Sequence, residues 1–559
     1  MDDIALPRTP EDSSSPRGCR VAAVTRRAFL RQAAALAAAT GSAAFPGTRL
    51  PGWTANRTTG ADGGGLVGAH VAAPWRSLAG SLDGRLVRPG NPTYPIDKQL
   101  FDKRFDGIRP AAIAFCKSAS DVQRCIDFAR RHGIQVAARS GGHSYGGYSL
   151  CHGLVVDVTA MSEIRVDPGR RRATVGAGAR LVDVYASLGQ KGYLLPSGSC
   201  PTVGIAGITL GGGVGVFSRQ YGLTCDQLSA VHVVTADGHL LICDRSHHAN
   251  LFWACRGGGG GNFGVVTSFT FDVHPIPPIA LFTLVWPWSA AIDTLGAWLR
   301  WVPGTADALW SNCQLLSSPN GGSGTQPTVR VTGVFCDAPE TLAAELAPLR
   351  SAVGTAPLYQ FVGPEQYLPA MLVEAGCEGE SVAACHLRTQ DPAGAITRSA
   401  FAAKSAYVTS TLPDSGITVA VEAVAALGDE VPDVGGGIVF DSYGGAVNRV
   451  APGATAFVHR DALAGLQWSF TWPTGAKHAV LAAGASWLAA TAHRLSPYVS
   501  GAYQNYIDPT LTDWLQAYYG SNLSRLVDVK RAVDPDDFFH FAQSVPTHLG
   551  ASPPSSTGR

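Results

Sequence analysis

The sequence predicts a mixed α+β protein of more than one domain, because strand and helix patterns alternate along most of the chain. At 559 residues it is too long for one ordinary hydrophobic core and suits two or three globular units. Apolar residues at helical spacing from Val122 to Ala129 predict a helix that ends at Gly133. Residues 134–138 then have the pattern of a strand, and the proline-rich segment 274–278 indicates a domain boundary.

The alternation continues on both sides of that boundary. Before it, we expect strands at 154–158, 173–175 and 265–271, a helix at 181–188, and a hairpin of strands 230–235 and 239–243. After it, strands alternate with helices rich in alanine and leucine up to residue 497. Two of these strands are expected at 438–445 and 467–472. The alternation of the first places Val439, Asp441 and Tyr443 on one face.

Composition excludes two classes of function. The 43 basic residues balance the 42 acidic ones, and past the N-terminal leader only short basic runs occur, so nothing indicates a nucleic-acid partner. The 12 cysteines form no paired C-x-x-C pattern, so no metal site is expected. Whether some of these cysteines form disulfides stays open, as does the oligomeric state.

The N-terminus resembles an export signal. Residues 25–31, TRRAFLR, precede a mildly apolar run from Ala33 to Ala44 that ends in small residues. Paired arginines before such a run resemble a bacterial twin-arginine signal peptide, here residues 1–45, which implies the twin-arginine export machinery as a partner and a secreted protein. A basic amphipathic helix is the alternative. The run is shorter than the roughly 20 residues of a membrane span, so no stable membrane anchor is expected.

Two familiar nucleotide motifs are excluded. Residues 259–264 fit the dinucleotide pattern G-x-G-x-x-G, but that motif must open a helix and needs an acidic residue about 20 positions later. Here a strand follows, and no acidic residue lies between Asp272 and Asp293. A Walker phosphate loop is also excluded, because G-K-[ST] does not occur.

Two other glycine-rich loops each contain one reactive side chain. The segment RSGGHSY at 139–145 contains His143, and the segment PSGSCPTVG at 196–204 contains Cys200. Bare backbone amides in such loops can hold a pyrophosphate, and glycine lets the chain approach a flat ring closely. On chemistry alone, two ordinary turns with a satisfied histidine and a buried thiol would explain the loops equally.

The two loops together resemble those of the berberine bridge enzyme family, within the vanillyl-alcohol-oxidase-like FAD flavoproteins. The resemblance covers residues 95–548 and includes the segments GGNFGVVT at 260–267, KSAY at 404–407, YQNY at 503–506 and AQSVP at 542–546. It implies a two-part PCMH-type FAD-binding domain and a substrate domain built on an antiparallel sheet covered by helices. The expected ranges are 96–277 and 498–548 for the FAD-binding domain, 278–497 for the substrate domain, 46–95 for a linker and entry segment, and 549–559 for a disordered tail.

By this resemblance the cofactor is FAD, bonded through its 8α-methyl group to His143 and through C6 to Cys200. An imidazole nitrogen and a thiolate are nucleophiles, which makes both bonds chemically reasonable. Further residues expected at the FAD site are Arg139, Ser140, Gly141, Gly142, Ser144, Tyr145, Gly198, Val203, Gly204, Gly207, Gly264, Val266 and Asn505.

The resemblance also implies catalytic residues. Tyr506 lies where the family has its base, although a phenol with a pKa near 10 needs neighbours that stabilise the phenolate; a core tyrosine is the alternative. Gln467 lies where the plant alkaloid-cyclising member has a glutamate. An amide cannot accept the proton, so we expect Gln467 to hydrogen-bond the flavin or the substrate. Tyr443 or Asp441 is expected to assist Tyr506.

Three functions are compatible with the sequence. Val203 resembles the oxidase version of a position that gates oxygen in the family, which predicts an oxidase that uses O₂ and releases H₂O₂. The first function is an exported oxidase of an alcohol carbon in a sugar or oligosaccharide. The second is a tailoring oxidase for a secondary metabolite, such as a glycosylated aromatic compound or an alkaloid, and the third is a non-catalytic secreted binding protein. The sequence does not identify the substrate.

Overall fold

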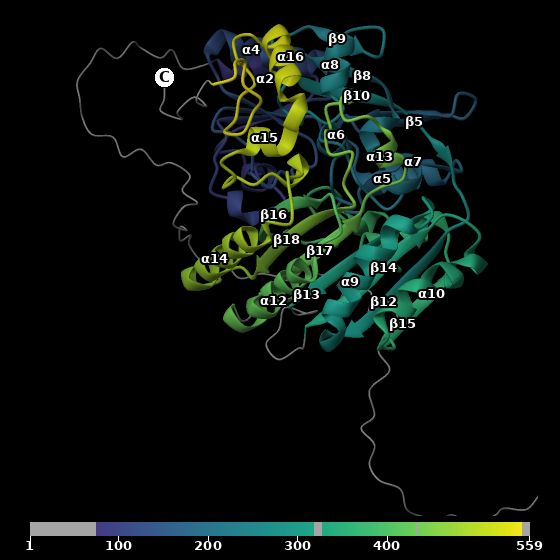
Figure 1. The fold of residues 1–559 in the computed structure, drawn as a ribbon. Coiled ribbons are helices and arrows are strands. Elements are labelled where there is room, and N and C mark those ends of the chain that lie inside the picture. The colour runs from purple at the N-terminus through teal and green to yellow at the C-terminus, as the bar shows by residue number, and fades with distance from the viewer. Residues whose placement is uncertain (1–73, 318–326, 432–433, 551–559) are drawn as a thin grey trace, which may run out of the picture.

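The computed structural model describes residues 74–317, 327–431 and 434–550 and has two parts (Figure 1). One part combines N-terminal strands with the C-terminal helices, and the other is a large sheet with helices on one face. The predicted signal peptide lies outside the described residues, as does most of the predicted tail, so export stays a prediction. Within the described ranges, no helix has the length and apolar character needed to cross a membrane.

The first sheet has the order β1-β2-β4-β3, and its strands β2 and β3 run parallel to β4. Its strands are β1 (Arg85–Val87), β2 (Ala112–Phe115), β3 (Val136–Arg139) and β4 (Leu154–Asp157). Helix α4 (Ala119–His132) connects β2 to β3; the Ser118 hydroxyl caps its start, and Gly133, at φ 59°, ends it. The predicted helix and the strand that leads into the RSGGHSY loop are therefore confirmed.

The segment predicted as a linker and entry, residues 46–95, is described from residue 74 onward, and that part contains short regular elements. Helices α2 (Trp75–Ser81) and α3 (Tyr94–Asp97) and strand β1 all belong to the first sheet region. The Asp121 carboxylate of α4 accepts hydrogen bonds from the amides of Asp83 and Gly84, which fixes this segment on the domain. These elements are short and lack clear periodicity, which is why the sequence pattern did not indicate them.

The second sheet is antiparallel, with the order β5-β6-β10-β8-β9. Its strands are β5 (Ile164–Asp167), β6 (Arg172–Gly176), β8 (Leu228–Val234), β9 (Leu240–Cys243) and β10 (Val265–Asp272). The helices beside it include α5 (Leu181–Gly189), α6 (Ile205–Leu210) and α8 (Ala249–Ala254). The predicted hairpin is confirmed. Strand β5 and the short helix α6, which lies inside the second glycine-rich segment, were not predicted.

The second part of the molecule, predicted as the substrate domain, is a seven-stranded antiparallel sheet with the order β15-β12-β14-β13-β17-β18-β16. Its strands are β12 (Ala280–Pro287), β13 (Leu309–Leu316), β14 (Thr328–Phe335), β15 (Tyr359–Pro364), β16 (Ala400–Val408), β17 (Gly435–Ser442) and β18 (Ala464–Trp472). Helices α9 (Ala291–Trp301), α10 (Leu342–Val353), α12 (Asp414–Glu430) and α14 (His478–Leu495) cover one face (Figure 1). The α+β fold with a helix-covered antiparallel sheet is thus confirmed.

Strand alternation gives this sheet two different faces. Residues such as Cys313, Phe440 and Trp468 point into the apolar core under the helices. Their neighbours Asn312, Asp441 and Gln467 point the other way, toward the first part of the molecule. Polar side chains are thereby collected on the face opposite the core.

Strand β17 ends three residues before the predicted limit. Gly444, at φ 96°, and Gly445, at φ 55°, take backbone conformations that a strand cannot continue.

The C-terminal segment returns to the first part of the molecule, where α15 (Trp514–Tyr519) and α16 (Leu523–Val533) join its apolar core and α16 lies against α8 (Figure 1). Lys530 of α16 is fully buried. Its Nζ donates hydrogen bonds to the carbonyl oxygens of Asn262 and Phe539, at 2.9 and 2.6 Å, and pairs with the Asp534 carboxylate at 2.7 Å. A buried cation with three acceptors fastens the C-terminal segment to the loop before β10.

We therefore expect Lys530→Met to lower the free energy of unfolding by about 3–5 kcal/mol, because the buried Asp534 carboxylate loses its cation. Urea unfolding followed by tryptophan fluorescence measures this loss. The neighbouring Arg531→Met is the control, since that side chain is about half exposed and should cost less than about 1 kcal/mol. Equal unfolding midpoints for the two variants would show that the Lys530 contacts do not hold the segment.

Candidate active site

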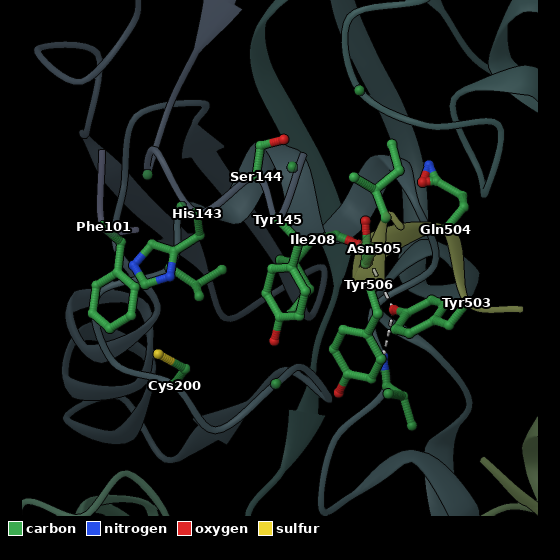
Figure 2. A pocket seen from close by; sticks show the side chains of 18 of the residues that line it. Phe101, His143, Ser144, Tyr145, Cys200, Ile208, Tyr503, Gln504, Asn505 and Tyr506 are labelled. Atoms are coloured by element: carbon green, nitrogen blue, oxygen red, sulfur yellow. Dashed lines mark hydrogen bonds between the residues drawn. The ribbon is translucent and has the colours of Figure 1, made fainter. Parts of the chain in front are cut away.

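A cavity of about 540 Å³ lies between the two parts of the molecule. The RSGGHSY loop, the Cys200 loop, the C-terminal YQNY segment and the polar face of the large sheet all line it. Figure 2 shows His143 and Cys200 at one end, Tyr506 at the other, and Tyr145 between them. Segments that are far apart in the sequence therefore meet at one site.

His143 is held as a neutral imidazole. Its Nε2 lies 2.9 Å from the Thr202 hydroxyl, and its ring stacks on Phe101 with 4.3 Å between ring centres (Figure 2). Burial, helped by the positive charge of Arg180, lowers the pKa of His143 from 6.5 to about 3. The Nδ1 atom makes no hydrogen bond to any residue in the described ranges, so this nitrogen keeps a lone pair or a proton for a ligand.

Cys200 faces the same end of the cavity. Its Sγ lies 4.0 Å from the Thr202 hydroxyl, and the residue is partly exposed to the cavity. Burial raises the pKa of the Cys200 thiol above its usual value, so the group rests as a thiol. Thr202, which is fully buried, contacts both reactive residues. We did not predict Thr202, although its place between Cys200 and Val203 was a signal for it.

The two glycine-rich loops touch through their backbones. A Cβ atom at Gly141 would lie 2.1 Å from the Gly204 nitrogen, and one at Gly204 would lie 2.2 Å from the Ser140 hydroxyl. Gly142 has φ 69°, a left-handed conformation that glycine adopts without strain. Only glycine at these positions lets the loops carrying His143 and Cys200 meet.

The lining of the cavity fits FAD. The residues predicted to bind FAD all line it: Arg139, Ser140, Gly141, Gly142, Ser144, Tyr145, Gly198, Val203, Gly204, Gly207, Gly264, Val266 and Asn505. A Cβ atom added at Gly207 would have no neighbouring atom within 4 Å. A Cβ atom added at Gly260 would have its nearest neighbour 3.8 Å away. Bare backbone thus faces open space, as a flat ring or a phosphate requires.

Three tyrosines form one wall of the cavity. The Gln467 side-chain amide donates a hydrogen bond to the Tyr145 hydroxyl at 3.0 Å, and the Tyr145 and Tyr506 rings stack with 5.4 Å between centres. The Tyr503 hydroxyl accepts hydrogen bonds from the amide of Gly213 and the side chain of Asn505, each at 2.9 Å (Figure 2). Gln467, expected to bond the flavin or the substrate, therefore bonds Tyr145 here, and we did not predict this pair.

Tyr506, from the C-terminal segment, and Asp441, from β17, both line the cavity. Burial raises the pKa of Tyr506 well above 10, and the neighbouring Tyr145 and Asp441 raise it further. Asp441 lies opposite Asn312 in the sheet. Burial raises the pKa of Asp441 to about 6, although a hydrogen bond from Asn312 acts in the opposite direction and lowers it. At neutral pH, Tyr506 is a phenol and most Asp441 is a carboxylate.

Tyr443 is not among the residues that line the cavity, but it belongs to the buried aromatic cluster against which Tyr506 packs, so its assistance to Tyr506 stays a prediction. It follows the last residue of β17 and is buried, with its ring edge-on to Tyr407 at 5.4 Å. A Cβ at Gly465 would lie 2.8 Å from this ring, so the space left by that glycine holds the ring against the sheet.

Glu374 was missed by the sequence analysis. It is the last residue of α11 (Tyr367–Glu374) and lines the cavity, where Glu374 and Asp441 are the acidic residues among the described lining. Burial, and then the charge of Asp441, raises the pKa of Glu374 to about 7. No motif surrounds Glu374, and only the packing of α11 brings it here.

Comparisons with known proteins agree with this geometry. The family described as "FAD binding domain" matches residues 110–244, and "Berberine and berberine like" matches residues 502–546. The FAD-linked oxidoreductase YgaK of Bacillus subtilis is 31% identical over 481 residues, which is 83% of this chain and 97% of YgaK. Berberine bridge enzyme-like 12 of Arabidopsis thaliana is 31% identical over 480 residues, which is 78% of this chain and 85% of that protein.

Solved structures have the same fold. Physcomitrella patens BBE-like 1 superimposes with a TM-score of 0.76 at 28% identity, covering 85% of this chain and 99% of that one. The xylooligosaccharide oxidase of Myceliophthora thermophila C1, solved with xylobiose, superimposes with a TM-score of 0.74 at 27% identity. The match covers 85% of this chain and 99% of the oxidase. The chain therefore belongs to the berberine bridge enzyme-like family of FAD-linked oxidoreductases.

Proposed function

We propose that this enzyme is an oxidase with FAD bonded to both His143 and Cys200, which oxidises an alcohol carbon of a sugar or oligosaccharide and passes the electrons to O₂ to give H₂O₂. The observation that carries the proposal is the convergence of His143, Cys200, Tyr506 and Asp441 on one cavity. The name of the xylooligosaccharide oxidase, a structural relative, supports the substrate class.

Two side chains are suited to hold the cofactor covalently. His143 is neutral, and its Nδ1 has no partner in the described chain, so this nitrogen is free to act as a nucleophile. Cys200 faces the same space from the second loop, and Thr202 fixes the position of both. FAD bound here would supply the acceptor for the hydride.

Removal of a hydride from an alcohol carbon also requires loss of the hydroxyl proton. A phenol with a raised pKa is a weak base, so Tyr506 alone does not meet this need. We assign proton acceptance to Tyr506 together with Asp441, whose carboxylate is ionised above pH 6. Tyr145, stacked on Tyr506 and bonded to Gln467, holds the Tyr506 ring in place.

The substrate side of the cavity favours a ligand rich in hydroxyl groups. Asn312 and Gln314 of β13 and Ser469 and Thr471 of β18 line it with amides and hydroxyls. Asn312 and Thr471 already bond within the sheet, to Gln314 and to the Gly435 carbonyl. The Gln314 amide oxygen and the Ser469 hydroxyl make no hydrogen bond within the described ranges, so they can bond sugar hydroxyls, and a largely aromatic substrate would leave them unsatisfied. This wall is the reason for preferring a sugar over a secondary metabolite.

A peroxide-coupled screen of the purified holoenzyme against sugars, oligosaccharides and aromatic glycosides tests the function. We expect H₂O₂ with at least one oligosaccharide, and catalase should abolish the signal. Stopped-flow mixing of the substrate-reduced enzyme with O₂ separates an oxidase from a dehydrogenase. Reoxidation as slow as in a flavin dehydrogenase would contradict the oxidase assignment even if the sugar bleaches the flavin.

The two covalent bonds are tested by variants at each loop. In His143→Ala we expect the flavin to remain with acid-precipitated protein through Cys200, whereas in the double variant with Cys200→Ala nearly all of it should enter the supernatant. Absorbance near 450 nm of pellet and supernatant measures this. Cys151→Ala, a buried thiol outside the cavity, is the control and should keep its flavin. Free flavin from the unaltered protein would rule out both bonds.

The role of Asp441 predicts a pH dependence. Because only the carboxylate accepts a proton, the rate of flavin reduction by substrate should fall about tenfold per unit as the pH drops below about 6. Asp441→Asn should lower the rate by about 10²–10⁴-fold and remove this part of the profile. Asp307→Asn, at an exposed ion pair with Arg449, should behave like the parent enzyme. A flat profile between pH 5 and 7 in the parent enzyme would refute the assignment.

A further inference from the structure

A second cavity, of about 480 Å³, lies on the other side of the loop that carries His143. Residues 139–142 separate it from the flavin cavity, since they line both. Its other walls include parts of α3 and of residues 178–183, Asp157 at the end of β4, and parts of residues 386–390 of the substrate domain. Arg180 lines this second cavity and not the first.

Arg180 is a buried cation whose side chain makes no hydrogen bond or ion pair with any residue in the described ranges. Its side chain is 9% exposed, and its Nη1 atom is fully buried without a hydrogen bond. No residue of the described chain accepts a hydrogen bond from its guanidinium group. Burial lowers the pKa of Arg180 to about 10, so the group is still charged at neutral pH.

The other buried charges around this cavity already have partners. The Arg139 Nε pairs with the Asp157 carboxylate, and His386 pairs with Asp183 at 3.1 Å. The Nη1 atom of Arg139, however, is also buried without a hydrogen bond. Two guanidinium groups therefore have unsatisfied donors beside the same cavity.

The carboxylates of Asp157 and Asp183 also line this cavity and favour the charged form of Arg180. They pair with Arg139 and His386, however, and not with Arg180 itself. A buried guanidinium group whose donors stay unbonded is still costly. The planar guanidinium fork matches the oxygens of a phosphate or carboxylate better than an ammonium group does. We propose that the second cavity binds a small oxyanion through Arg180, with the free Nη1 of Arg139 beside it. This site is separate from the proposed substrate and flavin sites, and its assignment does not depend on them.

The site is coupled to His143. The charge of Arg180 contributes to the low pKa of His143, after the larger effect of burial. Gln390, which lines the second cavity, also donates a hydrogen bond to the carbonyl oxygen of Thr202, the residue that contacts His143. An anion that neutralises Arg180 should therefore change the electrostatic field at the flavin and shift its absorption spectrum.

The test is a titration of holoenzyme with flavin already in place, so that added anions cannot simply occupy the phosphate positions of FAD. Sodium phosphate, sodium sulfate and sodium acetate are added separately at constant ionic strength. Calorimetry measures affinity, and a flavin difference spectrum reports the coupling. We expect one saturable site per chain and a dissociation constant at least tenfold weaker in Arg180→Gln. The control is Arg85→Gln, since Arg85 lines the same cavity but is half exposed and paired with Asp97.

The outcomes identify the ligand or overturn the site. Saturation by phosphate and sulfate alone supports a tetrahedral oxyanion, and saturation by acetate supports a carboxylate. Failure of all three to saturate the unaltered holoenzyme overturns the proposal, as does equal affinity in Arg180→Gln. If Arg180→Gln does not fold, Arg180→Lys, which keeps the charge without the planar fork, should still weaken binding; unchanged affinity in that variant counts against the site.

Discussion

The close approach of two glycine-rich loops is the constraint on which the site depends. The backbones at Gly141 and Gly204 touch, and no side chain fits between them. That contact brings His143 against Thr202 and places Cys200 beside it. Any larger residue at either glycine would push the loops apart and separate the two groups that we propose as flavin tethers.

The large sheet supplies the other half of the site through the alternation of its strands. One face is used for the apolar core under the helices, so polar residues are free to gather on the opposite face. Burial then alters their chemistry. It keeps His143 neutral and Tyr506 protonated, and it brings the pKa of Asp441 close to physiological pH. The same enclosure thus prepares both a nucleophile and a proton acceptor.

Much of this architecture could be predicted from the sequence, because its signals are local or belong to a motif. Helix α4 has regular apolar spacing, and the flavin loops have distinctive glycines around His143 and Cys200. Glu374 and Phe101 could not be predicted, since only tertiary packing brings them to the cavity. Strand alternation did not show that β17 ends before Tyr443, which lies in the buried cluster beside Tyr506 and does not line the cavity with Asp441. Arg180 was missed because an unpaired buried charge is visible only in three dimensions.

The central claim is that one flavin joins the two glycine-rich loops through His143 and Cys200. Proteolytic digestion of the holoenzyme, followed by mass spectrometry of the fragments that absorb visible light, tests it most directly. We predict a single yellow species in which the peptide containing His143 and the peptide containing Cys200 are linked through one FAD. Recovery of both peptides at their unmodified masses, with all FAD free in solution, would contradict it.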